Sequence, residues 1–145
     1  MDRQHIDISR DLDGHPVVFA CFDLREEEIG ASAHAVAASA AERFRNTEMS
    51  ADDVIELREL TALVDELAGL ALQPGLRTVV MRPARLNVYR DSVARFVESR
   101  DESEWVREAD REPLARVRAL LLPLEELSAD ALRAALTGGS APRAH

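Results

Sequence analysis

The hydrophobic pattern of the chain alternates at first and becomes helical near residue 23. Ile6 and Ile8 alternate with polar residues, and an Asp-Gly step separates them from the apolar run 17–22. An Asp-Gly pair between two apolar segments indicates a tight hairpin turn. The pattern predicts a β-hairpin with strands at about 4–10 and 16–22. Its second strand is apolar on both faces, so we expect it to be covered on both sides.

The next two segments have the three- and four-residue spacing of amphipathic helices. The first is predicted at about 24–46, with Asp23 as N-cap because a glutamate follows three residues later. Ser50, followed by an aspartate at the same spacing, caps a second helix that runs to about Leu72. The many alanines of the first helix would allow a neighbouring helix to approach closely.

Residues 76–82 leave two interpretations open. Thr78 to Met81 are mostly β-branched or apolar and are bounded by Gly75 and Pro83, which favours a short third strand at 77–82. The alternative is a helical turn that continues through the proline.

Cap signals and prolines divide the remaining chain into several helices. Pro83 suits the first turn of a helix that ends near Arg100. Asp101 then caps a helix that holds Trp105, and Pro113 starts a new segment. After a second proline, Ser128 caps a last helix that runs through residue 136 and is closed by a Gly-Gly pair.

The predicted fold class is mainly α, with α+β as the alternative. Four to five packed helices accompany a small N-terminal β-hairpin, and one further short strand is added if 76–82 is extended. At 145 residues the chain has the usual size of one domain. We therefore expect a single domain over 1–137, with the hairpin at 4–22, the helices at 24–137 and a flexible tail at 138–145.

Composition narrows the possible chemistry. All 18 basic residues are arginine, so mechanisms that need a lysine, including Schiff-base formation and phosphate loops, are excluded. Residues 1–75 hold sixteen acidic residues and six arginines, whereas 76–145 hold eleven and twelve. With a net charge of −9, broad nucleic-acid binding is not expected.

The cellular setting is also inferred from composition. A high alanine content and the absence of lysine are typical of proteins from bacterial genomes that are rich in G and C. The chain has one cysteine, no apolar leader and no apolar stretch of membrane-spanning length. We expect a cytoplasmic protein that neither crosses nor binds a membrane.

Asp11-Leu12-Asp13-Gly14 resembles the nucleophile motif of haloacid-dehalogenase-like phosphatases, in which the first aspartate attacks phosphorus. The resemblance covers only four residues, and the residues before it are polar instead of apolar. The lysine that the family requires is also missing, because the chain contains no lysine. The segment is therefore predicted to be a hairpin turn.

No set of metal ligands or catalytic residues stands out. The four histidines form no ligand pair at helical or strand spacing, and although His5 and His15 could meet across the hairpin, a metal site needs three or four ligands. Cys21 lies in an apolar run and is expected to be a buried structural thiol. We expect no metal and no cofactor.

Arginines are concentrated in residues 77–100. The six are Arg77, Arg82, Arg85, Arg90, Arg95 and Arg100. Pairing with the acidic first half of the chain is the preferred interpretation, and binding of an acidic ligand or protein is the alternative. Trp105 is expected at the edge of the core, with a partner surface as the alternative.

The function predicted from these features is a non-enzymatic interaction or regulatory domain that self-associates, as a homodimer, through its amphipathic helices. The alternative is a small-molecule-binding protein or small enzyme. Its site would lie between the helices and the hairpin and use Arg82, Arg85 and Tyr89. Trp105 is a further possible contact residue for a partner.

Overall fold

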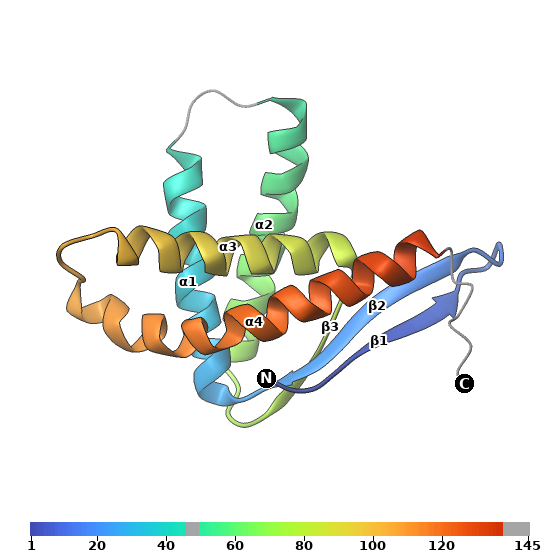
Figure 1. Ribbon diagram of the computed structural model, residues 1–145, viewed down its shortest axis with the longest axis horizontal. Coiled ribbons are helices and arrows are strands. Elements are labelled where there is room, and N and C mark those ends of the chain that lie inside the picture. Colours follow the sequence, from blue (N-terminus) through green and yellow to red (C-terminus); the bar gives the residue numbers. More distant parts are fainter. Residues whose placement is uncertain (46–49, 138–145) are drawn as a thin grey trace.

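The computed structural model describes residues 1–45 and 50–137. The described elements are β1 (Asp2–Arg10), β2 (Pro16–Leu24), α1 (Glu26–Phe44), α2 (Ala51–Ala71), β3 (Arg77–Met81), α3 (Pro83–Asp101) and α4 (Glu108–Leu136). The fold is mainly α with a small N-terminal hairpin, as predicted. Figure 1 shows α3 and α4 crossing the pair formed by α1 and α2. The hairpin of β1 and β2 packs against the C-terminal part of α4.

The predicted hairpin is confirmed, and each of its strands is slightly longer than expected. β1 pairs antiparallel with β2, with Ile6 opposite Ala20. In the turn, the Asp11 carboxylate accepts hydrogen bonds from the backbone N–H groups of Asp13 and His15. Gly14 has a φ of +81°, a conformation that residues with a side chain rarely adopt.

Residues 77–81 form a strand, so the strand interpretation of this segment is confirmed. β3 pairs antiparallel with β2 and makes β2 the central strand of the order β1-β2-β3. Val79 and Met81 are buried, whereas Thr78 and Val80 are exposed. This period of two is the pattern of a strand that has one face against the core.

The predicted N-cap of the first helix at Asp23 is wrong. β2 continues through Leu24, and Asp23 accepts a hydrogen bond from the Thr78 hydroxyl across the sheet at 2.7 Å. The N-cap is Arg25, whose backbone N–H donates to the Glu28 carboxylate at 2.8 Å. The second cap is confirmed, since the Asp53 backbone N–H donates to the Ser50 hydroxyl.

The predicted division of the C-terminal region into separate helices is wrong. Residues 102–107 are not helical, and a single helix, α4, then runs from Glu108 to Leu136 with Pro113 and Pro123 inside it. Each internal proline removes one hydrogen bond and costs roughly 3 kcal/mol. Ser128 is buried within α4 and caps nothing.

Burial of a continuous apolar stripe explains why α4 persists across both prolines. The stripe keeps helical spacing through its whole length and consists of Leu114, Val117, Leu120, Leu124, Leu127 and Ala131, all buried. Burying one leucine contributes about 1.5–3 kcal/mol, so the stripe offsets the cost of the prolines. The predicted Gly-Gly stop and the tail at 138–145 lie outside the described residues.

Small side chains on α1 allow three other helices to pack around it. α1 contacts α2, α3 and α4. Its buried positions include Ala31, Ala35 and Ala40, and two serines whose hydroxyls bond to groups on α3. Because alanines and serines occupy most of the buried positions of α1, they permit the close helix approach that the alanine content predicted.

The described helices cover only one face of the sheet. Val18, Ala20, Phe22 and Leu24 of β2 alternate along its inner face and are buried against the helices. The residues between them point to the opposite side. This outer face consists of His5, Asp7, Ser9, Val17, Phe19, Cys21, Asp23, Thr78 and Val80, of which Asp23 is buried beside Thr78.

The prediction that the second strand is covered on both sides therefore holds for one side only within the described residues. Val17 and Phe19 of the outer face are half-buried, although Cys21 is buried among its neighbours on adjacent strands. Val80 on the edge strand is 51% exposed. The outer face combines an apolar central strand with open access to solvent.

The close packing around α1 can be tested by enlarging one alanine. Ala35→Leu places extra methyl groups in a filled core and should lower the free energy of unfolding by about 1–3 kcal/mol. Ala37→Leu makes the same change on the exposed side of α1 and should alter it little. Chemical denaturation of both variants measures the difference, and equal stabilities would contradict the packing described.

Candidate functional site

The structure brings two of the predicted site residues, Arg82 and Arg85, to one hollow. Arg82 is the N-cap of α3, and Arg85 lies in its first turn. Both line a hollow of about 170 Å³ together with Phe19, Glu59, Val80 and Met81. Arg82 also lines a neighbouring hollow of about 160 Å³. Each is smaller than the roughly 300–1,000 Å³ usual for small-molecule sites.

Arg85 is already paired with carboxylates of α2. Its Nε lies 3.1 Å from Glu59 and its Nη1 lies 3.1 Å from Glu66. Partial burial opposes the charge of the guanidinium, but the two carboxylates outweigh it, so the pKa of Arg85 is raised. Together with the Arg100–Glu42 ion pair, this confirms the predicted pairing of arginines with the acidic first half for these two residues.

Arg82 differs from Arg85 because no described carboxylate lies within 4.0 Å of its guanidinium. Its guanidinium carbon lies 5.7 Å from the centre of the Phe19 ring, a cation–π contact at the surface. Arg82 is exposed. Its charge is thus available to an acidic group from outside the described residues.

Tyr89 does not join the two arginines. It is fully buried, its hydroxyl hydrogen-bonds to Ser32, and its ring stacks on Phe22. Burial raises the pKa of Tyr89 far above its usual range. The side chain is therefore part of the core and has no surface for a ligand.

Trp105 is not at the edge of the core, where it was expected. It lies between α3 and α4, outside any helix, and is 71% exposed. The expectation failed because the cap at Asp101 does not start a helix. An exposed tryptophan corresponds to the alternative interpretation, a contact with a partner.

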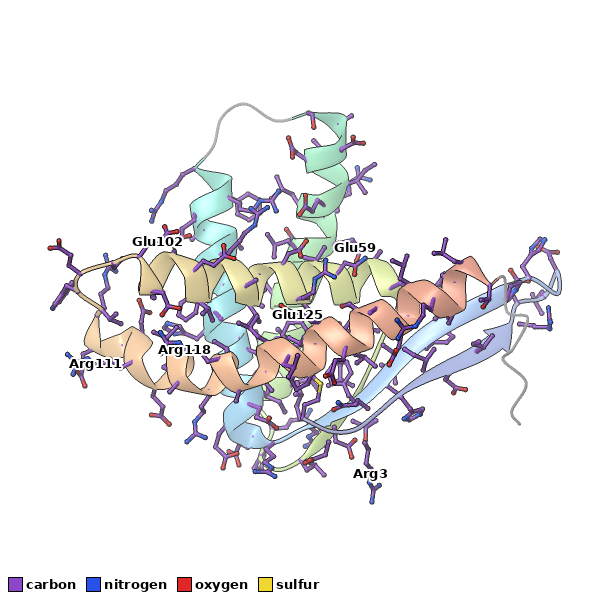
Figure 2. All side chains as sticks on the ribbon, viewed as in Figure 1. Arg3, Glu59, Glu102, Arg111, Arg118 and Glu125 are labelled. Carbon is purple, nitrogen blue, oxygen red and sulfur yellow. The ribbon has the colours of Figure 1, made fainter. Side chains whose placement is uncertain are left out.

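The outer face of the sheet contains a row of three residues with contrasting chemistry. Asp7 on β1 is opposite Phe19 on β2, and Arg82 follows the Ala20–Met81 pair and contacts the other side of Phe19. Across the sheet, the row therefore has an acidic residue on β1, an aromatic residue on β2 and a basic residue directly after β3. Figure 2 shows Arg3, near the start of β1, extending from the sheet away from the helices.

Cys21 lies next to this row and is not an activated thiol. Burial and the nearby Asp7 carboxylate both raise the pKa of Cys21. A thiol with a raised pKa is a poor nucleophile at neutral pH. The expectation of a buried structural thiol agrees with this environment.

A polar network that the sequence did not predict joins α1, α3 and α4. Asp110 accepts from Arg100 at 3.2 Å and hydrogen-bonds to His34 at 2.7 Å. Burial favours the neutral form of Asp110, but His34 and Arg100 outweigh it, so the pKa of Asp110 is lowered. The guanidinium of Arg100 and the ring of His34 both contact Phe96.

This network has the His–Asp part of a hydrolytic site without its nucleophile. The buried hydroxyls of Ser32 and Ser39 bond to α3 rather than to His34, and the thiol of Cys21 belongs to the sheet. Within the described residues, no hydroxyl or thiol is hydrogen-bonded to His34. The network is therefore best explained as a link between helices.

The hairpin turn gathers Asp11, Asp13 and His15 on the surface. The hydrogen bonds of Asp11 to the backbone of the turn account for this arrangement. His5 is opposite Cys21, several residues along the hairpin from His15, so the two histidines do not meet. The described residues thus do not assemble the His5–His15 pair considered from the sequence.

Comparisons with known proteins provide no relative. No protein-family model, curated protein or solved structure matches the chain at a significant level. Among the described helices, none combines the length and apolar composition needed to cross a bilayer. The functional argument therefore depends on the surfaces described above.

The network at Asp110 predicts a pH-dependent loss of stability. Asp110→Asn removes the carboxylate that Arg100 and His34 share, and should lower the free energy of unfolding by about 2 kcal/mol at pH 7. Because the folded-state pKa is lowered, this stabilisation is present above the unfolded pKa of about 3.9 and is lost as pH falls below it.

Asp130→Asn is the matched control for this experiment. Asp130 lies on the same helix and makes an exposed ion pair with Arg133, so its removal should cost less than about 0.5 kcal/mol. Urea denaturation at pH 7 and at pH 3 measures both variants. Equal effects of the two substitutions at pH 7 would show that the network does not stabilise the fold.

Proposed function

We propose that the protein is a non-enzymatic interaction domain that self-associates through the outer face of its sheet. The observation that carries this proposal is the two-sided apolar character of β2. Its inner residues are buried by helices, whereas Val17 and Phe19 on the other side are partly exposed beside Val80. A short strand segment that is apolar on both faces is typical of a strand covered on both sides.

The amphipathic helices are less suited to self-association than the sequence indicated. The apolar stripes of α1, α2 and α3 are buried in the core of the chain for most of their length, and Phe44, Val54 and Ile55 are exposed at the connected ends of α1 and α2. On α4, Leu122, Leu132 and Leu136 are exposed, but Glu125, Asp130 and Arg133 stand between them. Scattered apolar residues on a surface are normal and need no partner.

The arrangement of polar groups supports binding of a protein rather than catalysis or capture of a small molecule. The hollow at Arg82 and Arg85 is small, and the charge of Arg85 is matched by Glu59 and Glu66. His34 and Asp110 lack a hydrogen-bonded nucleophile in the described chain. An interface, in contrast, needs only a complementary surface.

Self-association is tested by sedimentation velocity from low to high micromolar concentration. The wild-type chain should shift from monomer towards dimer as concentration rises. Val80→Lys places a charge on the outer face and should keep the protein monomeric over the same range. Val80 is half-exposed on an edge strand, so the substitution should have little effect on folding, which thermal unfolding checks.

Leu132→Lys provides the matched control on α4. Leu132 is 57% exposed, close to the 51% of Val80, so the two substitutions add the same charge at similarly accessible positions. The control should associate like the wild type. A wild-type chain that stays monomeric would refute self-association, and loss of association in Leu132→Lys alone would assign the interface to α4.

A further inference from the structure

The outer face of the sheet has exposed charges of opposite sign on its two sides. Asp7 lies on β1 and Arg82 directly follows β3, with Phe19 of β2 between them. Asp23 of the same face is buried and accepts a hydrogen bond from Thr78. Neighbouring strands are about 4.8 Å apart, so the two charges of one chain are separated by roughly 10 Å. No ion pair joins them within the chain, and both side chains are exposed.

Two-fold symmetry would make this row complementary to itself. A two-fold axis that runs along β2, between two facing sheets, exchanges the two sides of the row. Asp7 of one copy would then face Arg82 of the other copy, twice in each dimer, with the two Phe19 rings between the pairs. A two-fold axis across the strands would instead place Asp7 opposite Asp7 and Arg82 opposite Arg82.

The charges therefore select one orientation from the two aligned ways in which sheets can pack. From these observations we infer that the partner on the outer face is a second copy of this chain, related by a two-fold axis along β2 and held by reciprocal Asp7–Arg82 ion pairs. This inference rests on the proposed self-association and adds its orientation and its specific contacts.

The size of the face sets the strength of the association. Strands of up to nine residues, at about 3.3 Å per residue and 4.8 Å apart, give a face of about 400 Å². A standard interface buries about 800 Å² on each partner. The dimer is therefore weak and concentration-dependent, so a few charge pairs are a large part of what decides its geometry.

Two charge-reversed variants test the inference. In the Asp7→Arg variant, positions 7 and 82 are both basic. In the Arg82→Asp variant, both positions are acidic. Each variant alone would bring like charges together in the inferred dimer, and its self-association should be about tenfold weaker than that of the wild type. An equal mixture should form a heterodimer in which every facing pair is again opposite in charge.

Sedimentation equilibrium of the two variants, separately and mixed at the same total concentration, measures this. The mixture should have a higher average mass than either variant alone. High salt should reduce that difference because it screens both the repulsion and the attraction. Circular dichroism of each variant checks folding, and Asp is also an acceptable N-cap at position 82.

The neutral substitutions Asp7→Asn and Arg82→Gln form a second pair of variants. Each removes the attraction without adding repulsion, so each should weaken self-association less than its charge-reversed counterpart. Mixing the two should restore part of the association, because the heterodimer keeps one facing pair, Arg82 of the first variant opposite Asp7 of the second. If the wild type dimerises through the outer face but each charge-reversed variant associates as strongly as the wild type, or the mixture of neutral variants recovers nothing, the inferred orientation is wrong and the proposed function stands. If the wild type does not dimerise, both fail.

Discussion

The position of β2 between β1 and β3 is the constraint on which the structure depends. β2 pairs with a strand on each edge, and its side chains alternate between the two faces of the sheet. The register of the two pairings therefore also fixes which residues of β1 and β3 lie on each face. Ala20 and Phe22 point inward and support the helices, so Phe19 and Cys21 must point outward. A one-residue shift in pairing would exchange the two faces and expose the residues that hold the core. The chemistry of the outer face therefore follows from the burial of the inner one.

Packing around α1 and pairing of charges then hold the two halves of the chain together. The small residues of α1 allow α3 and α4 to pack closely against it. Acidic residues of the first half form ion pairs with arginines of the second. Arg85 bridges α3 to α2, while Arg100 links α3 to Glu42 on α1 and to Asp110 on α4. Three acidic residues of the first half are thus neutralised by two arginines of the second inside one chain. Arg82 is not among these arginines, since its guanidinium stacks on Phe19 without a described carboxylate.

Local sequence signals predicted the hairpin, the first two helices, the third strand and the start of α3, because turn residues, caps and periodicity act over a few residues. They failed where tertiary burial outweighs local preference. The buried stripe of α4 carries the helix through Pro113 and Pro123, and cross-strand pairing extends β2 past Asp23. The closeness of Arg82 and Arg85 followed from helical spacing. The row from Asp7 to Arg82 depends on strand register, which no local pattern provides.

Net charge narrows the choice of interface still further. Two copies with a charge of −9 repel each other, and at physiological salt this repulsion acts over about 8 Å. The exposed side of α2 is unsuited to self-contact because this helix has six acidic residues and one arginine. On the outer face of the sheet, the exposed Asp7 is balanced by Arg82 and the exposed centre is apolar, so this face carries less of that repulsion than α2. The charge distribution therefore supports the proposal that the sheet, rather than α2, is the place of contact.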